Sequence, residues 1–420
     1  MRTEGLPRYL MLDFNAYFAS VEQQVRPELR SRPVAVVPIE GTDSTCAIAA
    51  SYEAKRMGVK TAMRIFEARK VCPDLVCVPA RHDLYVDYHE RLMAEVANHL
   101  PIHKIGSIDE CSCRLSGTER EPANAKKIAL GMKAGIHAKV GAYLHCSIGI
   151  APTLLLAKIA TKMQKPDGLV VIEEHELPGP LLKMQLTDLP GIALNMEARL
   201  NSAGVMSIED LWHLEPKEAR LVWGSVGGER FWYELHGVDI QHVTGDRRSI
   251  GHSRVLSPQM RPPDRARIVA RALLLKAATR LRRYGLAAGA LGVSARAEWK
   301  SRYVADTTLS PTQDSFVLLG ELDRMWWRLF AAHDPREPMK KVSIWMHHLV
   351  PVTTRVPDLF IAQRPDGLTR GEALWRAIDK LGGKYEAGIV APASQRGLSL
   401  QYLGAKIAFT RVPEAVEFRE

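Results

Sequence analysis

"KIGSIDECSCRL", residues 104–115, has the residue types of a β-strand and yet carries two adjacent carboxylates, Asp109 and Glu110. The small and apolar residues around the acids favour an extended strand, in which neighbouring side chains point to opposite faces. Charged side chains are almost never buried in proteins without a partner. The stretch therefore predicts a strand whose two acids are paired with something elsewhere in the molecule.

Length and composition indicate a globular protein of several domains. At about 100–200 residues per domain, the 420-residue chain is long enough for two to four domains. An apolar content of 46% is ordinary for such a protein, and no run of about 18 apolar residues predicts a membrane span. The start, "MRTEGLPRYLMLDF", lacks the apolar core of a signal peptide. The six cysteines show no C-x-x-C spacing, which favours free thiols in a reducing cytoplasm over a zinc site.

Positive charge is concentrated in one segment of the chain. The whole sequence has a formal net charge of +10, from 57 basic and 47 acidic residues. Residues 247–302 alone contain 14 Lys and Arg against two acids, Asp264 and Glu298, so their excess is larger than that of the whole chain. A basic domain on a nearly neutral body is the electrostatic pattern of a protein that binds a phosphate backbone.

The order of apolar patterns predicts an α+β fold, with two mixed modules separated by a helical one. The first module ends near residue 173, and its expected elements include a strand over 8–14, helices over 82–100 and 123–139, and a helix in "TLLLAKIATKMQKP" that Pro166 closes. Residues 174–240 have helical patterns with glycine-containing turns. The second module, 249–352, combines three expected strands with helices over about 262–284 and 312–332. In the tail, a capping box of Thr369 and Glu372 precedes a last helix.

Asp13 ends the first expected strand, and Asp109 and Glu110 lie in the strand expected over 104–115. If the two strands are neighbours in one sheet, three carboxylates converge and repel one another unless cations lie between them. An oxygen-only site suits Mg²⁺ or Mn²⁺, and a pair of such ions can hold both oxygens of a phosphoryl transfer. The alternative is that each acid is an ordinary turn or solvent-exposed residue. The two places together, with a basic domain downstream, favour the metal site.

Six segments carry a family pattern. They are "LDFNAYFASVE" (12–22), "ASYEAKRMGV" (50–59), "GSIDE" (106–110), "SIGIAPTLLLAKIATKMQKPDG" (147–168), "LTDLPGI" (186–192) and "SIGHSRV" (249–255). In this order and spacing they resemble the Y-family DNA polymerases, the translesion enzymes that include bacterial polymerase IV and the catalytic subunit of polymerase V. The resemblance covers residues 8–350, and its motifs mix features of both types.

The resemblance implies a right-hand polymerase with a ferredoxin-like palm, small fingers, a helical thumb of helix-hairpin-helix elements and an α+β little finger. The implied divisions are palm 1–27 and 82–173, fingers 28–81, thumb 174–240, linker 241–248, little finger 249–352 and C-terminal tail 353–420. The implied activity is low-fidelity, template-directed primer extension with dNTPs past template damage. The implied location is a bacterial cytoplasm, in association with the nucleoid.

The family's metal and nucleotide residues can be carried over by motif. Asp13 and Asp109 would bind both of two Mg²⁺ ions, for which Mn²⁺ can substitute. Glu110 would bind the ion at the primer 3′-hydroxyl, and the backbone carbonyl of Phe14 the ion on the nucleotide side. The remaining expected residues are the backbone of Ala16 and Tyr17 at the triphosphate, the steric gate Phe18, the triphosphate donors Tyr52, Lys55 and Lys158, and Cys46 and Ile48 over the replicating base pair. A flat ring such as Phe18 beneath the sugar rejects ribonucleotides because a 2′-hydroxyl clashes with it.

Without the resemblance, these residues have ordinary alternatives: Phe18 as a core aromatic, Tyr52 as a helix tyrosine and the lysines as solvated side chains. Two departures from the family pattern stand out. Lys55 stands where many members have Arg, and it lacks the planar fork of a guanidinium. Ala193 stands where the helix-hairpin-helix motif has a second Gly, which puts the hairpin's contact with DNA in doubt but not its fold.

The implied partners are primer-template DNA, dNTP and a sliding clamp, with the protein a monomer and no membrane involved. The residues expected to contact the DNA backbone are Arg247, Arg248, Arg254, Arg296 and Lys300. The segment "QLTDL" (185–189) looks like a clamp peptide but leads into the thumb hairpin, so we interpret it as structural. A second function stays open, that of a catalytically inactive relative that binds DNA and bridges repair proteins. Such a relative would be expected to lose some of the acids, and all three are present.

Overall fold

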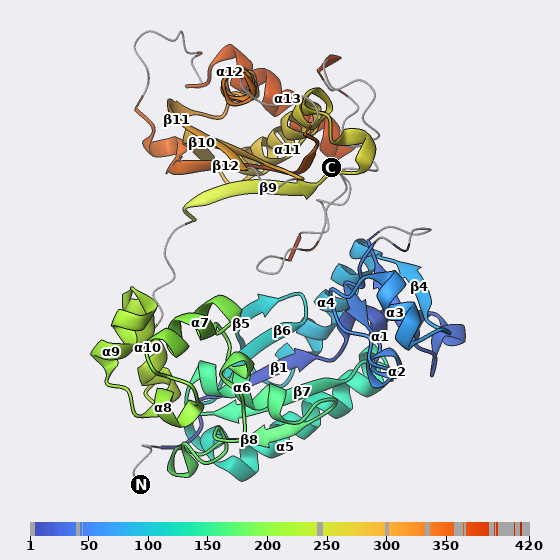
Figure 1. Cartoon of the computed structure of the whole chain (residues 1–420), viewed down its shortest axis with the longest axis vertical. Helices are drawn as coiled ribbons and strands as arrows, with labels where there is room; N and C mark the ends of the chain where they lie inside the picture. The colour runs from blue at the N-terminus through green and yellow to red at the C-terminus, as the bar shows by residue number, and fades with distance from the viewer. Residues whose placement is uncertain are drawn as a thin grey trace. The chain divides into compact units, whose positions relative to one another are not determined.

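The structure is a computed structural model of the whole chain. It describes residues 5–38, 43, 45–241, 247–298, 302–331, 337–356, 364, 367–385, 390, 392–393, 407 and 412–413. The chain forms two compact units, one of residues 1–242 with 406–415 and one of residues 243–405 with 416–420, and each is described by itself (Figure 1). The expected α+β class is confirmed in both.

The first unit is built on a five-stranded sheet in the order β5-β6-β1-β7-β8. The central strand β1 (Tyr9–Phe14) is antiparallel to β6 (Glu110–Arg114) and to β7 (Cys146–Ala151). The edges are β5 (Ile102–Ser107) and β8 (Leu169–Val171). The nearly continuous apolar sequence of β1 and β7 fits strands with both faces covered. The expected strand over 8–14 is therefore the centre of the sheet.

Helix α6 (Leu154–Met163) covers the face of the sheet to which Tyr9 and Met11 point, and these two side chains share a core with Leu156 and Ile159. Its close approach depends on Gly149 in β7, because a Cβ there would lie 2.1 Å from the backbone oxygen of Ala157. Since side chains alternate along a strand, Asp13 belongs to the same face as Met11. The α6 face thus carries the first of the expected acids.

The other helices of this unit follow the expected pattern and end a few residues earlier than expected. The helix expected over 82–100 is α4 (His82–Ala97). The helix expected over 123–139 is α5 (Pro122–Gly135), followed by a π-helical turn (Ile136–Val140). Helix α1 (Tyr17–Val25) follows β1. A small sheet in the order β3-β2-β4 carries a further apolar cluster with two helices; these elements are β2 (Val34–Val37), β3 (Ala49–Ala50), β4 (Val76–Pro79), α2 (Tyr52–Arg56) and α3 (Ile65–Val71).

The stretch 104–115 is not one strand, so that prediction was wrong. Strand β5 ends at Ser107, Ile108 and Asp109 form a turn, and β6 begins at Glu110. The buried, apolar Ile108 hides the turn in the sequence, although Asp is itself a common turn residue. The two acids therefore lie in different structural elements, and opposite faces of a strand no longer separate them.

The helical part of the first unit contains α7 (Leu194–Ser202), α8 (Ile208–Trp212), α9 (Pro216–Trp223) and α10 (Val226–Leu235). Before α7, Gly191 has a φ of +90°, which favours glycine, whereas Ala193 is extended at −110° and tolerates a side chain. Ala193 is thus compatible with the hairpin. In "QLTDL", Leu186 and Leu189 are buried, which supports its structural interpretation.

The second unit contains a four-stranded antiparallel sheet in the order β11-β10-β12-β9, with α11 (Pro263–Arg283) and α12 (Ser315–Phe330) on one face. Its strands are β9 (Ser249–Val255), β10 (Leu286–Ala297), β11 (Arg302–Thr312) and β12 (Met339–Pro351). The edge strand β11 was not among the expected strands. Its alternating exposed residues and Pro311 gave it a weak apolar signal.

The helix expected in the tail is α13 (Arg370–Lys384), and Thr369 and Glu372 form its capping box. Ion pairs connect this helix to other residues of the second unit. Arg282 of α11 binds Asp379 with Nε–Oδ2 and Nη2–Oδ1 distances of 2.5 and 2.9 Å, and Arg355 binds Glu372 at 2.5 Å. In the part of the chain that is described, no helix is both long and apolar enough to pass through a bilayer. All six cysteines are free thiols, as expected.

Candidate active site

The strand register brings two of the three expected acids together. On β1, Asp13 lies directly opposite Glu110 of β6 and Ser147 of β7. Directly opposed residues of antiparallel strands lie on one face with their Cβ atoms about 5 Å apart. Asp13 and Glu110 therefore share the α6 face, at the end of the sheet where β1 stops.

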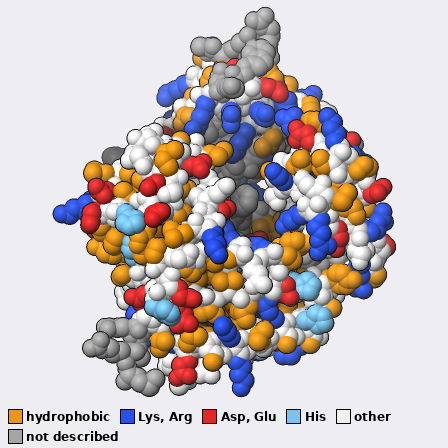
Figure 2. Space-filling view, turned by 60° about the horizontal axis from the view of Figure 1, so that its bottom comes forward, with side chains coloured by type: hydrophobic (Ala, Val, Ile, Leu, Met, Phe, Trp, Pro, Cys, Tyr) orange, Lys and Arg blue, Asp and Glu red, His pale blue; other side chains and the backbone are white. Residues whose placement is uncertain are grey.

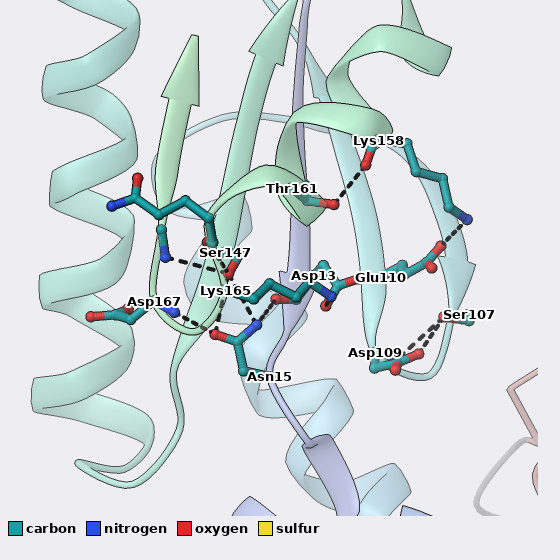
Figure 3. A network of polar contacts seen from close by, with 12 residues as sticks. Asp13, Asn15, Ser107, Asp109, Glu110, Ser147, Lys158, Thr161, Lys165 and Asp167 are labelled. Carbon is teal, nitrogen blue, oxygen red and sulfur yellow. Dashed lines mark hydrogen bonds and ion pairs between the residues drawn. The ribbon is translucent and has the colours of Figure 1, made fainter. Parts of the chain in front are cut away.

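The third acid reaches the same end through the turn. The backbone N–H of Phe14 donates to the carbonyl of Asp109 at 2.8 Å, which ties the turn to the last residue of β1. The hydroxyl of Ser107 donates to Asp109 Oδ1 at 2.5 Å. Figure 3 shows Asp13, Asp109 and Glu110 at this end of the sheet. The three acids thus lie at one end of the sheet, with Asp109 directed to Ser107.

A buried histidine of α4 also forms a hydrogen bond with this turn. His89 is 4% exposed, and its Nδ1–H donates to the carbonyl of Ile108 at 2.8 Å. Burial lowers the pKa of His89, so the neutral ring is the form that the fold prefers.

Acidification is therefore expected to destabilise the first unit through His89. Because the pKa of this ring is lower in the folded than in the unfolded chain, its contribution is complete above the unfolded value of about 6.5 and is lost as the pH falls through the folded value. The melting midpoint should fall between about pH 7.5 and pH 5 and fall less in His89→Gln, whose amide can still donate to Ile108. Equal slopes for the two proteins in melting curves followed by circular dichroism would contradict this.

The surroundings of Asp13 and Asp109 disfavour the ionised forms of their carboxyl groups. Burial raises the pKa of Asp13, and the charges of Asp109 and Glu110 raise it further, against the effect of Lys165. Burial likewise raises the pKa of Asp109, and Glu110 adds to the effect. Close carboxylates with raised pKa values favour a cation between them.

Two lysines are the cations that the protein itself supplies. Lys165 Nζ lies 2.5 Å from Asp13 Oδ1, and Lys158 Nζ lies 2.8 Å from Glu110 Oε2 (Figure 3). Lys158 was expected among the nucleotide donors, and the structure places it on an acid. Lys165 was missed, although it lies in the quoted segment 147–168, directly before Pro166.

The turn that carries Lys165 is anchored to β1 by Asn15, a second residue that sequence reasoning missed. Asn15 Oδ1 accepts from the backbone N–H of Asp167 at 2.7 Å, and Asn15 Nδ2 donates to Ser147 Oγ at 3.1 Å. From the other side, Lys133 Nζ binds Asp167 Oδ1 at 2.6 Å. The asparagine therefore connects β1, β7 and the lysine turn.

The donor set fits hard divalent cations, but the side chains are not arranged around one. Within the described ranges, no group of three or more His, Cys, Asp and Glu side chains is close enough to hold a metal ion. Asp13 and Glu110 are directed to the two lysines instead. The three acids offer oxygen ligands only, which Mg²⁺ and Mn²⁺ prefer. Their partial burial and their mutual repulsion favour a bound cation.

The start of α1 carries the expected triphosphate and gate residues. Ala16, the N-cap, has φ 47° and ψ 40°, a left-handed conformation that a residue with a side chain rarely adopts and that is frequent at functional sites. Tyr17 is buried, and its hydroxyl donates to the carbonyl of Tyr85 at 2.6 Å. Phe18 is half-buried, and its ring stacks on that of Tyr85 with centroids 4.3 Å apart.

Tyr52 and Lys55 of α2 also lie near the acids. The Nζ of Lys55 lies 4.5 Å from the centre of the Tyr52 ring. Burial raises the pKa of Tyr52 to about 12, with a further contribution from Asp13. Burial lowers the pKa of Lys55, and Lys165 lowers it further. The structure thus brings the expected donors of α2, Tyr52 and Lys55, close to Asp13 and Lys165.

Cys46 and Ile48, the expected residues over the base pair, lie beside the small sheet. Both are half-buried, and the backbone N–H of Ile48 donates to the carbonyl of Val36 at 2.9 Å. Cys46 forms an isolated bridge with Arg64.

The expected DNA-contact residues of the second unit differ in their surroundings. Arg247 and Arg248 are exposed, and the Arg247 guanidinium lies 3.8 Å from the centre of the Tyr284 ring. Arg296 is exposed on the sheet face that the helices leave uncovered, opposite Lys341. Arg254 pairs with the core residue Val342, so it belongs to the helix-covered face. Lys300 lies outside the described residues.

On the face of the molecule that Figure 2 shows, the basic side chains do not form one continuous patch. Figure 2 shows lysine and arginine side chains spread among acidic and apolar ones.

Sequence comparison finds one family over most of the chain. Residues 12–162 match the impB/mucB/samB family, and residues 247–359 match its C-terminal domain. DNA polymerase IV of Moorella thermoacetica is 32% identical over 406 residues, which cover 94% of this chain and 98% of that protein. DNA polymerase IV of Pelotomaculum thermopropionicum is 30% identical over 363 residues, which cover 84% of this chain and 87% of that protein.

Solved structures show the same fold. A Y-family DNA polymerase chimera of Dbh and Dpo4 is similar with a TM-score of 0.68 at 22% identity, covering 82% of this chain and 99% of that one. DinB from Sulfolobus solfataricus is similar with a TM-score of 0.53 at 22% identity, again covering 82% of this chain and 99% of that one. At this level of identity the likeness concerns the fold alone.

Proposed function

This chain belongs to the impB/mucB/samB family of Y-family DNA polymerases, and we propose that its three acids carry out template-directed nucleotidyl transfer with two divalent ions. Membership confirms the resemblance drawn from the six segments, and it makes the protein a DNA-directed DNA polymerase of translesion synthesis. The observation that carries the proposed site is the register of β1, which sets Asp13 opposite Glu110 with the Asp109 turn tied to Phe14.

In this proposal Asp13 and Asp109 would hold both ions, Glu110 would hold the ion at the primer terminus, and the carbonyl of Phe14 would serve the ion on the nucleotide side. When bound, Mg²⁺ or Mn²⁺ ions supply Lewis acidity for the primer hydroxyl and neutralise charge on the triphosphate. The primer 3′-hydroxyl attacks the α-phosphate of the dNTP, an O–P bond forms, and pyrophosphate leaves. The raised pKa values of Asp13 and Asp109 support this role, because only a cation makes their shared ionised state favourable.

The nucleotide is proposed to lie over the start of α1. The backbone of Ala16 and Tyr17 would meet the triphosphate, with the side chains of Tyr52, Lys55 and Lys158 as donors. We add Lys165 to this set because it already lies beside Asp13. Positive groups fixed at this place act on charge that develops on the leaving pyrophosphate. Phe18 is proposed as the steric gate, and Cys46 and Ile48 as the roof of the base pair.

The finer domain names and partners are also proposals. They comprise palm 1–27 and 82–173, fingers 28–81, thumb 174–240, linker 241–248, little finger 249–352 and tail 353–420. The DNA backbone would be met by Arg247, Arg248, Arg296 and Lys300, whereas the position of Arg254 on the helix-covered face argues against such a role for it. The protein would act as a monomer on primer-template DNA with a sliding clamp as partner, in a bacterial cytoplasm close to the nucleoid.

The proposed activity predicts a metal-dependent primer extension. With dNTPs, Mg²⁺ is expected to support incorporation, Mn²⁺ to replace it, and EDTA to reduce incorporation to background, because the proposed acids act only through divalent ions. The measurement is extension of a labelled primer resolved on a denaturing gel. No incorporation by the wild-type protein with either ion would favour the inactive, bridging relative, while full incorporation in EDTA would overturn the proposed site.

A further inference from the structure

The proposed gate ring is covered on one side by a fixed partner. Phe18 of α1 and Tyr85 of α4 stack nearly parallel, with an interplanar angle of 14° and ring centroids 4.3 Å apart. Tyr85 is completely buried, whereas Phe18 is half-buried. One face of the Phe18 ring therefore rests on the protein interior, and the angle of the ring depends on Tyr85.

Tyr85 is itself held by a buried carboxylate. Its hydroxyl donates to Glu22 Oε1 at 2.8 Å, and its backbone carbonyl accepts from the Tyr17 hydroxyl at 2.6 Å. Glu22 lies four residues after Phe18 on α1, so both side chains point from the same helix face toward α4. The ring of Tyr85 is thus fixed at both ends, by its backbone and by its hydroxyl.

Glu22 is fully buried, and its charge is paired. Arg81, the N-cap of α4, binds it through both oxygens, with Nε–Oε1 and Nη2–Oε2 distances of 3.0 and 2.5 Å. Such a bidentate pair fixes the plane of the carboxylate as well as its position. The carboxylate therefore presents Oε1 to the Tyr85 hydroxyl in one orientation.

We propose that Glu22 and Tyr85 are positioning residues for sugar selection: Glu22 fixes the Tyr85 ring, and that ring sets the angle at which Phe18 meets the sugar of the incoming nucleotide. This inference rests on the proposed role of Phe18 as the gate. A gate distinguishes a hydrogen from a hydroxyl at one carbon, so the ring must stay within about 0.5 Å of its place. A half-buried ring without a fixed partner can turn about its side-chain bonds and make room for the hydroxyl.

The test compares the incorporation of a ribonucleotide with that of the matching deoxynucleotide, as the ratio of their kcat/KM values on one primer-template. Tyr85→Phe removes the hydroxyl and keeps the ring, and it is expected to raise the relative use of the ribonucleotide about fivefold, the effect of one lost hydrogen bond. Tyr85→Leu also removes the stacked ring and should raise the ratio further. Glu22→Gln should act in the direction of Tyr85→Phe.

The matched control is Tyr9→Phe. Tyr9 is 6% exposed on β1, and its hydroxyl donates to Asp239 at 2.9 Å, so this variant also loses a tyrosine–carboxylate hydrogen bond. It should lower the melting midpoint without changing the sugar ratio. An equal change of the ratio in Tyr9→Phe, or an unchanged ratio in Tyr85→Phe, would overturn the positioning role.

Phe18→Ala separates this inference from the proposed gate. If Phe18→Ala raises ribonucleotide use and Tyr85→Phe does not, the gate stands and the support by Tyr85 is refuted. If Phe18→Ala has no effect, Phe18 is no gate, and the positioning role is refuted with it. If the role is correct, Tyr85→Phe added to Phe18→Ala produces no further increase, because there is no ring left to position.

Discussion

Asp109→Asn is expected to reduce primer extension by about a thousandfold or more, since removal of a carboxylate from a two-ion site costs several kcal/mol of transition-state stabilisation and each ~1.4 kcal/mol is tenfold in rate. The substitution keeps the size of the side chain and an oxygen that can accept from Ser107. It removes one negative charge from the three acids. The loss should therefore be one of chemistry and not of folding.

Single-turnover incorporation of one dNTP measures the effect, with Asp109→Ala as a second variant. Glu90→Gln, an exposed acid of α4, is the matched control and should retain wild-type rates. Burial raises the pKa of Asp109, so its charged form destabilises the protein without a cation. Asp109→Asn should consequently melt no lower than the wild type in EDTA. Equal rates for Asp109→Asn and wild type would refute the proposed site.

Phe18→Ala is expected to raise the use of ribonucleotides relative to deoxynucleotides by roughly a hundredfold, the scale on which an apolar pocket rejects an added hydroxyl. The ring is half-buried against Tyr85, so its removal opens space at the start of α1 without breaking a hydrogen bond of the sheet.

The ratio of kcat/KM values for a matched pair of nucleotides measures this effect. Phe18→Tyr keeps a ring at the same place and should retain selection. Phe66→Ala is the control for the loss of a partly exposed phenylalanine elsewhere, since Phe66 of α3 is 39% exposed. A sugar ratio that is the same in Phe18→Ala and wild type would contradict the gate.

Periodicity predicted the regular elements of the fold well and its irregular ones poorly. The helices α4 and α11 and the central strand β1 have long apolar patterns, which depend on burial alone. The turn at Ile108 and Asp109 was hidden because Ile108 is apolar and buried, as a strand residue would be, and because the bond from His89 to its carbonyl is distant in sequence. The edge strand β11 was missed since half of its residues face solvent.

The three acids could be proposed from sequence because spacing and family motif point to the same residues. Lys165 and Asn15 could not be found in this way. Their place depends on the packing of α6 on the sheet and on the turn that follows it, which bring residues 13 and 165 within 2.5 Å of each other. Lys158 stays a predicted residue of the site, and its partner, Glu110, could be identified only from the structure.

The two lysine–carboxylate pairs have a consequence for turnover. In the resting protein Lys165 and Lys158 bind Asp13 and Glu110, although the pKa of Asp13 remains raised by burial. In the proposed reaction, each of these two ammonium groups would leave its carboxylate and bind a phosphate oxygen of the nucleotide. Once pyrophosphate has formed, the carboxylates compete with it for the lysines. In this proposal, the return of the two lysines to their carboxylates would favour product release.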